Sequence, residues 1–387
     1  MHSLFFLVRR TLLVVSALVI VVMAVLLISL AIPITIWRTG ELPTEPILVR
    51  RADPFTVPPV RVWIDTDAAC GQGHRTDPDD CFAILLLAQQ STIEVVGIST
   101  VFGNASLHKT DRTTRDLINL LGKTEPHAIP VYRGASEPLN QEESISTVPP
   151  QEAHEALRKA LEEKPLVIVA LGPLTNVAMA LKDRPHLQAN VTRLVAVMGR
   201  RKGHVFHPVE GGMAHSFLGH GPIFRDFNVT EDEQAAAVVL AMGLPLTLIP
   251  YEAARDVRLD RSTFQTIEIL DGAAGWVAQR AHRWLTYWRD DINITGLYPF
   301  DLVAAAYVEP SLLRCTSVPV AVEEDTWLFG WLRYRGLFVK SGPRTESNSG
   351  SCFVLSECVG TPRNPVRRSV DEGISQPSGH GLVLSRG

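Results

Sequence analysis

The stretch that decides the fold runs from residue 60 to residue 67 and reads VRVWIDTD, and DDCFAILLLA follows at residues 79–88. The first stretch is an apolar, β-branched run that ends in two aspartates, which is typical of a buried strand at its carboxyl end. The second begins with two aspartates and continues as an apolar run, which predicts a helix. A buried strand that leads into a helix is the repeating unit of an α/β fold.

The alternation of strand and helix patterns continues along the chain. Apolar runs that predict strands lie at residues 61–65, 93–101, 166–171, 193–198 and 246–250. Helical patterns separate them at residues 81–89, 109–121, 152–162 and 233–242. This order predicts an α/β fold with an open, mostly parallel sheet that is flanked by helices. In such sheets ligands bind beyond the carboxyl ends of the strands, so functional residues are expected there.

Four carboxylates are expected together near the first strand end. Asp65 and Asp67 close the strand, and Asp79 and Asp80 open the helix that follows an eleven-residue loop. A hard divalent cation prefers oxygen ligands of this kind. Capping of the helix is the alternative interpretation of Asp79 or Asp80. Because a cap accounts for one residue of that pair and not for four carboxylates, the pattern favours a metal site.

Polar residues also stand at later junctions between predicted strands and helices. They are Asn104 in VFGN, Thr175 in GPLTN, Asp226 and Asn228 in DFN, and Asp301 in YPFD. Each motif also has a structural interpretation, such as an Asx turn at Asn104, a capped helix start at Thr175 or a helix cap at Asp301. Thr230 and Glu233 fit a capping box, so these two residues are assigned to helix initiation.

The order of these motifs resembles that of the inosine–uridine-preferring nucleoside hydrolases, over about residues 60–309. GPLTN together with the two aspartate pairs makes the resemblance specific, whereas either feature alone would not. The resemblance implies a nucleoside hydrolase-like fold. It also implies an enzyme, an N-ribohydrolase that cleaves the N-glycosidic bond of ribonucleosides or related N-ribosides and releases ribose and the free base.

The resemblance assigns roles to individual residues. It implies one Ca²⁺ ion, with ligands from the side chains of Asp67, Asp80 and Asp301 and from the main-chain carbonyl of Thr175. Asp67 would also accept the proton of the attacking water. Contacts to the riboside are implied for Asp79, Asn104, Asp226 and Asn228. Such a site is chemically coherent, because cleavage builds positive charge on the sugar, and carboxylates stabilise that charge.

Three features depart from the family pattern. The loop at residues 68–78 is much longer than the connection usual in the family, so it could reshape the pocket mouth, and Asp77 or His74 could enter the site. Phe300 stands where many members have a histidine that protonates the leaving base, and Asp226 stands where the family has a glutamate. A missing general acid costs about 10²–10⁴-fold in rate, so Phe300 bears directly on activity.

Aromatic residues gather close to one face of an expected helix near residues 276–288. Core packing is the default interpretation of Trp284, Tyr287 and Trp288. Alternatively, Trp284 and Trp288 stack on the base of the substrate, as rings do in some members of the family.

An uncharged apolar run at residues 12–32 is long enough to cross a bilayer. It predicts a single-pass membrane protein with the catalytic domain on the non-cytoplasmic side, and a cleaved signal peptide is the alternative. The expected order is a cytoplasmic tail and transmembrane helix at 1–36, a proline-rich stalk at 37–59, the catalytic domain at 60–340 and a disordered tail at 341–387. Cys352 and Cys358 lie close together in that tail and could pair outside the cytosol.

Other functions stay open beside hydrolysis. Phe300 and the long loop also suit a catalytically weak riboside-binding protein on the same fold. A stalked glycosyltransferase would use Asp65 and Asp67 to hold Mn²⁺ and a nucleotide sugar, and a phosphatase would use Asp65 as nucleophile, but neither accounts for GPLTN. The net charge of −4, without a basic block, argues against nucleic acid as a partner. A small-molecule riboside is the expected partner, and a homo-oligomer is a further possibility.

Overall fold

The structure is a computed structural model, and it describes part of the 387-residue chain. The described residues are 15–16, 18–24, 58–73, 76–122, 128–139, 151–201, 226–254, 257–292, 295–308, 315–318, 320–327, 332–339 and 353–356. Residues 15–16 and 18–24 are helical, and their large apolar side chains are exposed. Most of the expected membrane segment at 12–32 and nearly all of the stalk at 37–59 lie outside the described residues. Within the described part, no helix is long and apolar enough to span a membrane.

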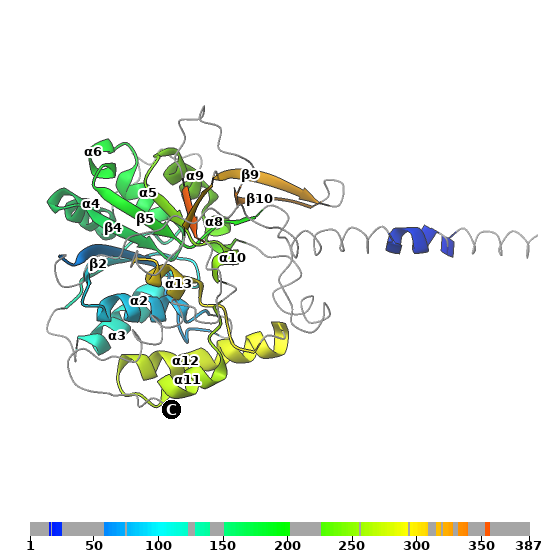
Figure 1. Cartoon of the computed structure of the whole chain (residues 1–387), viewed down its shortest axis with the longest axis horizontal. Helices are drawn as coiled ribbons and strands as arrows, with labels where there is room; N and C mark the ends of the chain where they lie inside the picture. Colours follow the sequence, from blue (N-terminus) through cyan, green and yellow to red (C-terminus); the bar gives the residue numbers. More distant parts are fainter. Residues whose placement is uncertain are drawn as a thin grey trace, which may run out of the picture.

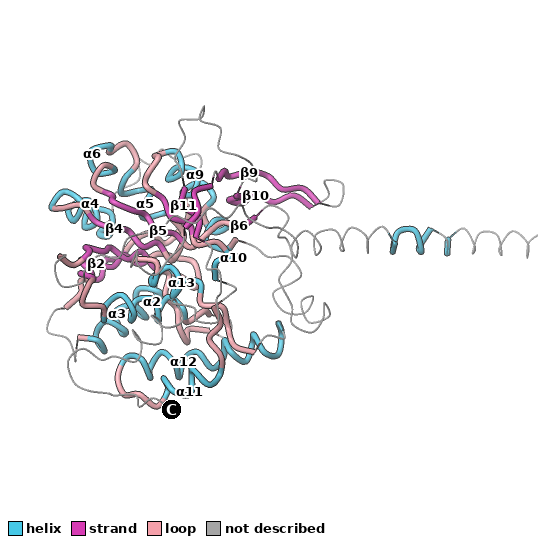
Figure 2. Tube along the Cα trace, in the orientation of Figure 1, coloured by secondary structure: helices cyan, strands magenta, loops and turns pink. Residues whose placement is uncertain are grey.

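An eight-stranded sheet forms the centre of the described domain (Figure 1, Figure 2). Its strands are β1 (Val60–Thr66), β2 (Ile93–Thr100), β3 (Val131–Arg133), β4 (Leu166–Ala170), β5 (Val191–Ala196), β7 (Leu246–Leu248), β8 (Cys315–Val318) and β11 (Phe353–Ser356). The spatial order is β3-β2-β1-β4-β5-β7-β11-β8, and only the β11–β8 pair is antiparallel. The chain builds outward from β1 to β3 and then returns to the other side of β1 with β4. The topological switch point, where ligands bind in such sheets, therefore lies beside the carboxyl end of β1.

Helices cover both faces of this sheet (Figure 1). One face is covered by α2 (Asp79–Gln89), α3 (Leu107–Leu121), α10 (Tyr251–Ala254), α11 (Arg261–Glu268), α12 (Ala273–Tyr287) and α13 (Phe300–Ala306). The opposite face is covered by α4 (Glu152–Glu163), α5 (Thr175–Leu181), α6 (Pro185–Gln188), α8 (Phe227–Glu231) and α9 (Glu233–Ala241). A π-helical turn, η2 (Trp288–Ile292), continues α12.

The two faces have separate cores because successive side chains of a strand point to opposite sides. Val62 and Ile64 of β1 pack with the apolar residues of α2 and α13, whereas Trp63 packs with those of α4 and α5. Trp63 has room for its ring because β2 carries Gly97 beside it, where a Cβ atom would lie 2.5 Å from the ring. β1 is thus buried on both sides, as its continuous apolar sequence predicts.

The predicted α/β architecture with an open, mostly parallel sheet is confirmed. Each of the five predicted strands and four predicted helices is present, with ends that differ from the prediction by at most two residues. A smaller sheet was not predicted; it has the order β6-β10-β9, from β6 (Arg200–Arg201), β10 (Leu332–Val339) and β9 (Val320–Trp327).

The C-terminal part of the domain differs from the prediction. β11 lies within residues 341–387, which the composition predicts to be disordered, and it pairs with β7 and β8 in the larger sheet. The short apolar run Phe353–Leu355 is enough to form this strand, although serine and glycine dominate the residues before it. The folded domain therefore extends beyond the expected boundary at 340. Cys352 and Cys358, with their expected pairing, lie outside the described residues.

Candidate active site

Two helix N-termini meet at the switch point and bring three carboxylates together. α2 begins with Asp79 and Asp80, and α13 carries Asp301 in its first turn. One oxygen from each of the three carboxylates lies within 4.8 Å of the others, and all three residues are buried. The backbone N–H of Asp301 donates to Oδ2 of Asp79 at 3.0 Å. Helix N-termini favour negative charge, so the two helices partly offset the repulsion within this cluster.

Asp67 joins the cluster from the carboxyl end of β1, and Asn104 links it to Asp80. The backbone N–H of Asn104 donates to Oδ2 of Asp67 at 2.7 Å. The amide nitrogen Nδ2 of Asn104 donates to Oδ1 of Asp67 at 3.3 Å and to Oδ2 of Asp80 at 3.0 Å. Thr66 adds a bond from its hydroxyl to Oδ1 of Asp80 at 2.5 Å. The structure thus brings together four predicted carboxylates, Asp67, Asp79, Asp80 and Asp301, from three separate segments of the chain.

Burial makes ionisation unfavourable for three of these carboxylates, those of Asp67, Asp80 and Asp301. Burial, followed by the charge of Asp79, raises the pKa of Asp80 to about 6. Burial and the charge of Asp80 raise the pKa of Asp67 well above its ordinary value, and burial with the charge of Asp79 does the same for the pKa of Asp301. A group of buried like charges of this kind is characteristic of a functional site.

The cluster fits a hard divalent cation. Its donor atoms are carboxylate oxygens, which Ca²⁺ and Mg²⁺ prefer, and they converge from several directions in a buried position. A bound cation would also lower the raised pKa values, because its charge favours the ionised form of carboxylates that burial and mutual repulsion disfavour. The residues present therefore suit a metal site.

Asp65 lies in a second, structural network behind the cluster. Its Oδ1 accepts a hydrogen bond from Ser99 at 2.5 Å and one from Nδ2 of Asn176 at 2.7 Å, while no described partner reaches its Oδ2. Burial raises the pKa of Asp65 to about 6. Asn176 also contacts His154, whose pKa burial lowers to about 4, so this histidine is neutral at pH 7. Asp65 thus orients buried neighbours behind the cluster and does not join the carboxylates with which the sequence groups it.

Thr175 begins α5 directly before Asn176, in the GPLTN turn. Its hydroxyl donates to Oδ2 of Asp232 at 2.6 Å. Because the hydroxyl is engaged with Asp232, the predicted metal contact would come from the main-chain carbonyl, and that contact stays a prediction.

Asp226 and Asn228 lie at the start of α8, and both are largely buried. Asp226 caps α8 through Val229 and accepts a hydrogen bond from the backbone N–H of Gly199 at 2.6 Å. Nδ2 of Asn228 donates to the carbonyls of Leu171 at 2.6 Å and Val197 at 2.9 Å, which follow β4 and β5. These bonds fix both side chains at the carboxyl edge of the sheet, and their contacts to a riboside stay a prediction.

The predicted capping box at Thr230 and Glu233 is wrong. Thr230 lies inside α8, and Asp232 is the residue that caps α9, accepting from the backbone N–H of Ala235 at 2.8 Å. The motif gave a wrong prediction because α8 ends at Glu231 and a second helix, α9, begins at Glu233. The cap of α9 therefore falls two residues later than the motif predicts.

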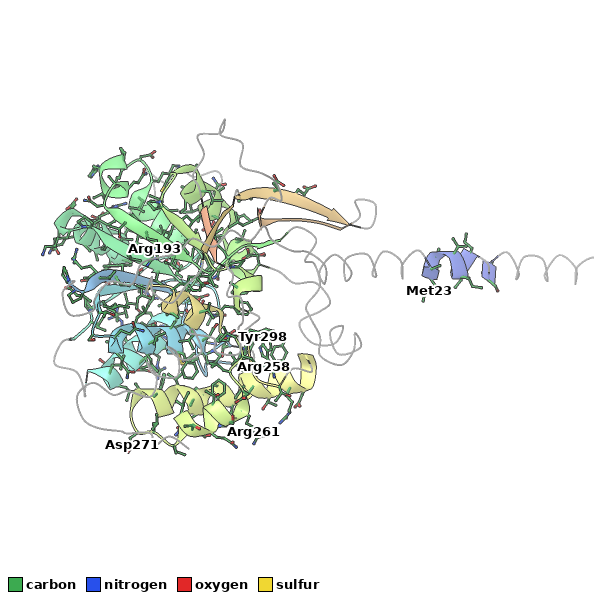
Figure 3. All side chains as sticks on the ribbon, in the orientation of Figure 1. Met23, Arg193, Arg258, Arg261, Asp271 and Tyr298 are labelled. Atoms are coloured by element: carbon green, nitrogen blue, oxygen red, sulfur yellow. A yellow bond between two sulfur atoms is a disulfide. The ribbon has the colours of Figure 1, made fainter. Side chains whose placement is uncertain are left out.

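Trp284 and Trp288 are buried in the core. Each is 5% exposed, and their ring centroids lie 6.1 Å apart. Trp288 packs edge to face on Tyr298, with ring centroids 5.2 Å apart. Figure 3 labels Tyr298 among the side chains of the domain. These contacts agree with core packing, the default interpretation of these rings. Base stacking stays a prediction, because the carboxylates of the site are buried to a similar degree.

The loop after β1 contains a feature that the sequence did not predict. A disulfide joins Cys70 in this loop to Cys81 in α2. Asp77, at the other end of the loop, accepts a hydrogen bond from the backbone N–H of Asp79 at 3.2 Å. The pairing could not be read from the sequence, because five cysteines allow many pairings. The one hint is that Cys70 and Cys81 each lie close to an aspartate of the predicted site.

Comparison with known proteins agrees with this fold and site. The family described as inosine-uridine preferring nucleoside hydrolase matches residues 62–351. An uncharacterized protein of Schizosaccharomyces pombe is 26% identical over 238 residues, which cover 56% of this chain and 69% of that protein. The pyrimidine-specific ribonucleoside hydrolase RihA of Escherichia coli is 31% identical over 200 residues, 46% of this chain and 57% of RihA. The matches thus span between about half and two thirds of these relatives.

Solved structures of similar fold bear related names. A plant nucleoside hydrolase superposes with a TM-score of 0.64 at 21% identity, over 83% of this chain and all of that one. A purine-preferring ribonucleoside hydrolase from Gardnerella vaginalis gives a TM-score of 0.60 at 20% identity, over 81% and 99%. The family match covers most of the chain, so this protein belongs to the inosine-uridine preferring nucleoside hydrolase family. The predicted family is therefore confirmed.

Proposed function

We propose that the domain hydrolyses the N-glycosidic bond of ribonucleosides or related N-ribosides and releases ribose and the free base, with Ca²⁺ as cofactor. The observation that carries the proposal is the buried meeting of Asp67, Asp79, Asp80 and Asp301 at the carboxyl edge of the sheet. Relatives named as pyrimidine-specific and purine-preferring hydrolases support the substrate class. Family membership favours this activity over the glycosyltransferase and phosphatase interpretations.

Asp67 is the proposed general base. It directly follows β1, and Asn104 holds both of its oxygens in place, so its carboxylate is oriented to accept a proton. Asp80 and Asp301, together with the main-chain carbonyl of Thr175, would hold the Ca²⁺ with Asp67. When bound, the ion supplies positive charge that orients a water molecule and acidifies it modestly.

Asp79 is the proposed partner of the ribose hydroxyls, because it opens α2 at the centre of the cluster. Asn104, after β2, and Asp226 and Asn228, at the start of α8, would line the rest of the ribose site. The carboxylates around the sugar would stabilise the positive charge that develops on it as the bond to the base breaks.

Phe300 favours a second candidate, a catalytically weak riboside-binding protein. This residue begins α13 directly before Asp301, where the resemblance implies a histidine that protonates the leaving base. A phenyl ring cannot donate a proton. The second candidate predicts that Ca²⁺ and ribose bind without turnover.

The experiment that tests the proposal follows release of reducing sugar from a panel of purine and pyrimidine ribonucleosides. We expect turnover by the wild-type protein and a loss of about 10²-fold or more in Asp67→Ala. Asp116→Ala is the matched control, because Asp116 is an exposed carboxylate on α3 that pairs with Arg112 and should leave the rate unchanged. An Asp67→Ala variant as active as the wild type would refute the assignment. Absent turnover with retained ribose binding would establish the binding protein instead.

We also propose a single-pass membrane protein whose catalytic domain faces the non-cytoplasmic side, with residues 12–32 as the membrane segment. The Cys70–Cys81 disulfide supports a location outside the reducing cytosol. The full-length protein should stay with membranes after alkaline carbonate extraction, and protease added to sealed vesicles should leave the domain intact when it faces the lumen. Release by carbonate would refute the anchor.

A further inference from the structure

The Cys70–Cys81 disulfide ties together two segments that each carry a carboxylate of the site. Cys70 lies three residues after Asp67, and Cys81 directly follows Asp80 at the start of α2. The two cysteines are 1% and 0% exposed. The bond is therefore a buried covalent link between the end of β1 and the start of α2, immediately beside the cluster.

The connection that this disulfide closes is long. Eleven residues, 68–78, separate Asp67 from Asp79, whereas connections from a strand to a helix usually have two to six residues. A longer loop loses more conformational entropy when its ends are brought together. A cross-link near the two ends restricts the loop and reduces that loss.

The rest of the loop is held by weaker contacts. Gln72 donates a hydrogen bond to Thr113 of α3 at 3.0 Å. Gly71 lies against the side chain of Arg280 in α12, so close that a Cβ atom would come within 2.7 Å of it. These contacts place the middle of the loop, but they do not join β1 to α2.

The two linked segments meet at the cluster. Asp67 and Asp80 are buried carboxylates; Asn104 donates hydrogen bonds to both of them, and Thr66 donates one to Asp80. Those hydrogen bonds depend on the orientation of the carboxylates, whereas the disulfide holds the backbone whatever the charge of the cluster. A metal site gains affinity when its ligands are held in place before the ion binds.

We propose that the Cys70–Cys81 disulfide is a positioning element of the carboxylate cluster, which holds Asp67 and Asp80 at a metal-binding separation. This inference rests on the proposed function, because it assumes that the cluster binds Ca²⁺. The cysteines are positioning residues and not ligands, since each sulfur is engaged with the other. Because both are buried, the bond is a permanent part of the folded domain.

The test measures the Ca²⁺ affinity of the full-length protein by isothermal titration calorimetry, in the wild type, Cys70→Ala, Cys81→Ala and the double variant. Each single substitution removes the whole bond. We expect each to weaken Ca²⁺ binding about 10–100-fold, the range typical of groups that orient metal ligands. The double variant should be no weaker than the singles, because both remove the same interaction. Sugar release should need correspondingly more Ca²⁺ for half-maximal rate, with kcat restored at saturating Ca²⁺.

The matched control is Val239→Ala in α9, a buried residue on the opposite face of the sheet. It should lower Tm without changing Ca²⁺ affinity, which separates positioning from general stability. If the wild type is active and the cysteine variants bind Ca²⁺ as tightly as it does, the inference is overturned and the proposed function stands. A wild type that neither binds Ca²⁺ nor releases sugar would overturn both.

Peptide mass spectrometry of the unreduced wild-type protein covers the case in which the cysteine variants do not fold. We expect a cross-linked peptide pair that contains Cys70 and Cys81. Free thiols at both positions in an active, Ca²⁺-binding protein would overturn the inference.

Discussion

Two glycines pack closely against Asp67, in addition to the hydrogen bonds that hold its carboxylate. Gly103 has φ +150°, and a Cβ atom there would lie 2.0 Å from Oδ2 of Asp67. On the opposite side, a Cβ atom at Gly172 would lie 3.1 Å from Cγ of Asp67. Both glycines belong to motifs that the sequence singles out, VFGN and GPLTN. Their function in these motifs is to leave room for the carboxylate.

Gly103→Ala should therefore displace Asp67. We expect a loss of about 1–3 kcal/mol in the free energy of unfolding, the usual cost of overpacking, and a fall of about 10–100-fold in Ca²⁺ affinity. Urea unfolding and calorimetric titration measure the two effects. Gly272→Ala is the control, because Gly272 also has a positive φ, +82°, but no atom lies within 4 Å of its Cβ position. Equal effects of both substitutions on Ca²⁺ affinity would disprove the steric account.

The raised pKa values of the cluster predict how stability depends on pH in the metal-free protein. The pKa of Asp80 is 3.8 when unperturbed and about 6 in the folded protein, so the folded state binds more protons in this interval. Stability contributed by the protonated cluster is full below pH 3.8 and is lost as pH rises through about 6. Ca²⁺ should reverse the loss at pH 7, because it binds the ionised carboxylates of the folded state.

Thermal unfolding from pH 4.5 to 7.5, with chelator and with Ca²⁺, measures this effect in the interval set by the folded and unfolded pKa values. We expect the Tm difference between the two conditions to widen as pH rises. A Tm difference that stays constant or narrows as pH rises would contradict the raised pKa values of the cluster and the binding of Ca²⁺ to its ionised carboxylates.

At the scale of elements, the GPLTN turn connects three parts of the sheet. Nδ2 of Asn176 donates to Asp65 in β1 at 2.7 Å and to the carbonyl of Thr100 in β2 at 3.1 Å. Its Oδ1 accepts from the backbone N–H of Ala135 at 2.8 Å. The first turn of α5, with Thr175, is thereby fixed against the carboxyl ends of β1 and β2.

Asn176→Leu should remove all of these bonds, so that Asp65, the carbonyl of Thr100 and the N–H of Ala135 each lose a buried partner. At about 1–3 kcal/mol for each buried group, we expect a loss of at least 3 kcal/mol in the free energy of unfolding, measured with urea. Asn190→Ala serves for comparison, since Asn190 makes one side-chain bond, to the carbonyl of Leu161, and should cost about 1 kcal/mol. Similar losses in the two variants would contradict the central position of Asn176.

The sequence predicted the elements that are buried and regular. β1, β2 and β4 are continuous apolar runs, and their ends were located to within one residue. The boundary between α8 and α9 was missed because the sequence offers two possible helix caps close together. The capping box at Thr230 and Glu233 was chosen, whereas the structure uses Asp232. β11 was missed because its partners, β7 and β8, are distant in sequence, and a three-residue apolar run has no periodicity of its own.

At the scale of the whole molecule, the parallel sheet assembles the site from distant parts of the chain. Strands and helices follow each other in a regular order around the larger sheet (Figure 2). This order brings Asp67, Asp80, Asn228 and Asp301 to its carboxyl edge. That order was readable from the sequence, so the carboxylate cluster could be predicted. The disulfide could not, because it depends on side-chain packing that no local pattern specifies. Core packing of Trp284 and Trp288, by contrast, was the default interpretation of their sequence.

The most direct test of the central claim is the addition of Ca²⁺ to protein that has been stripped with chelator, followed by measurement of free ribose released from inosine and uridine. We expect no release from the stripped protein and restored release when Ca²⁺ is added, with Asp67→Ala inactive in both conditions. Release that continues in the stripped wild-type protein would contradict a metal-dependent N-ribohydrolase at this cluster.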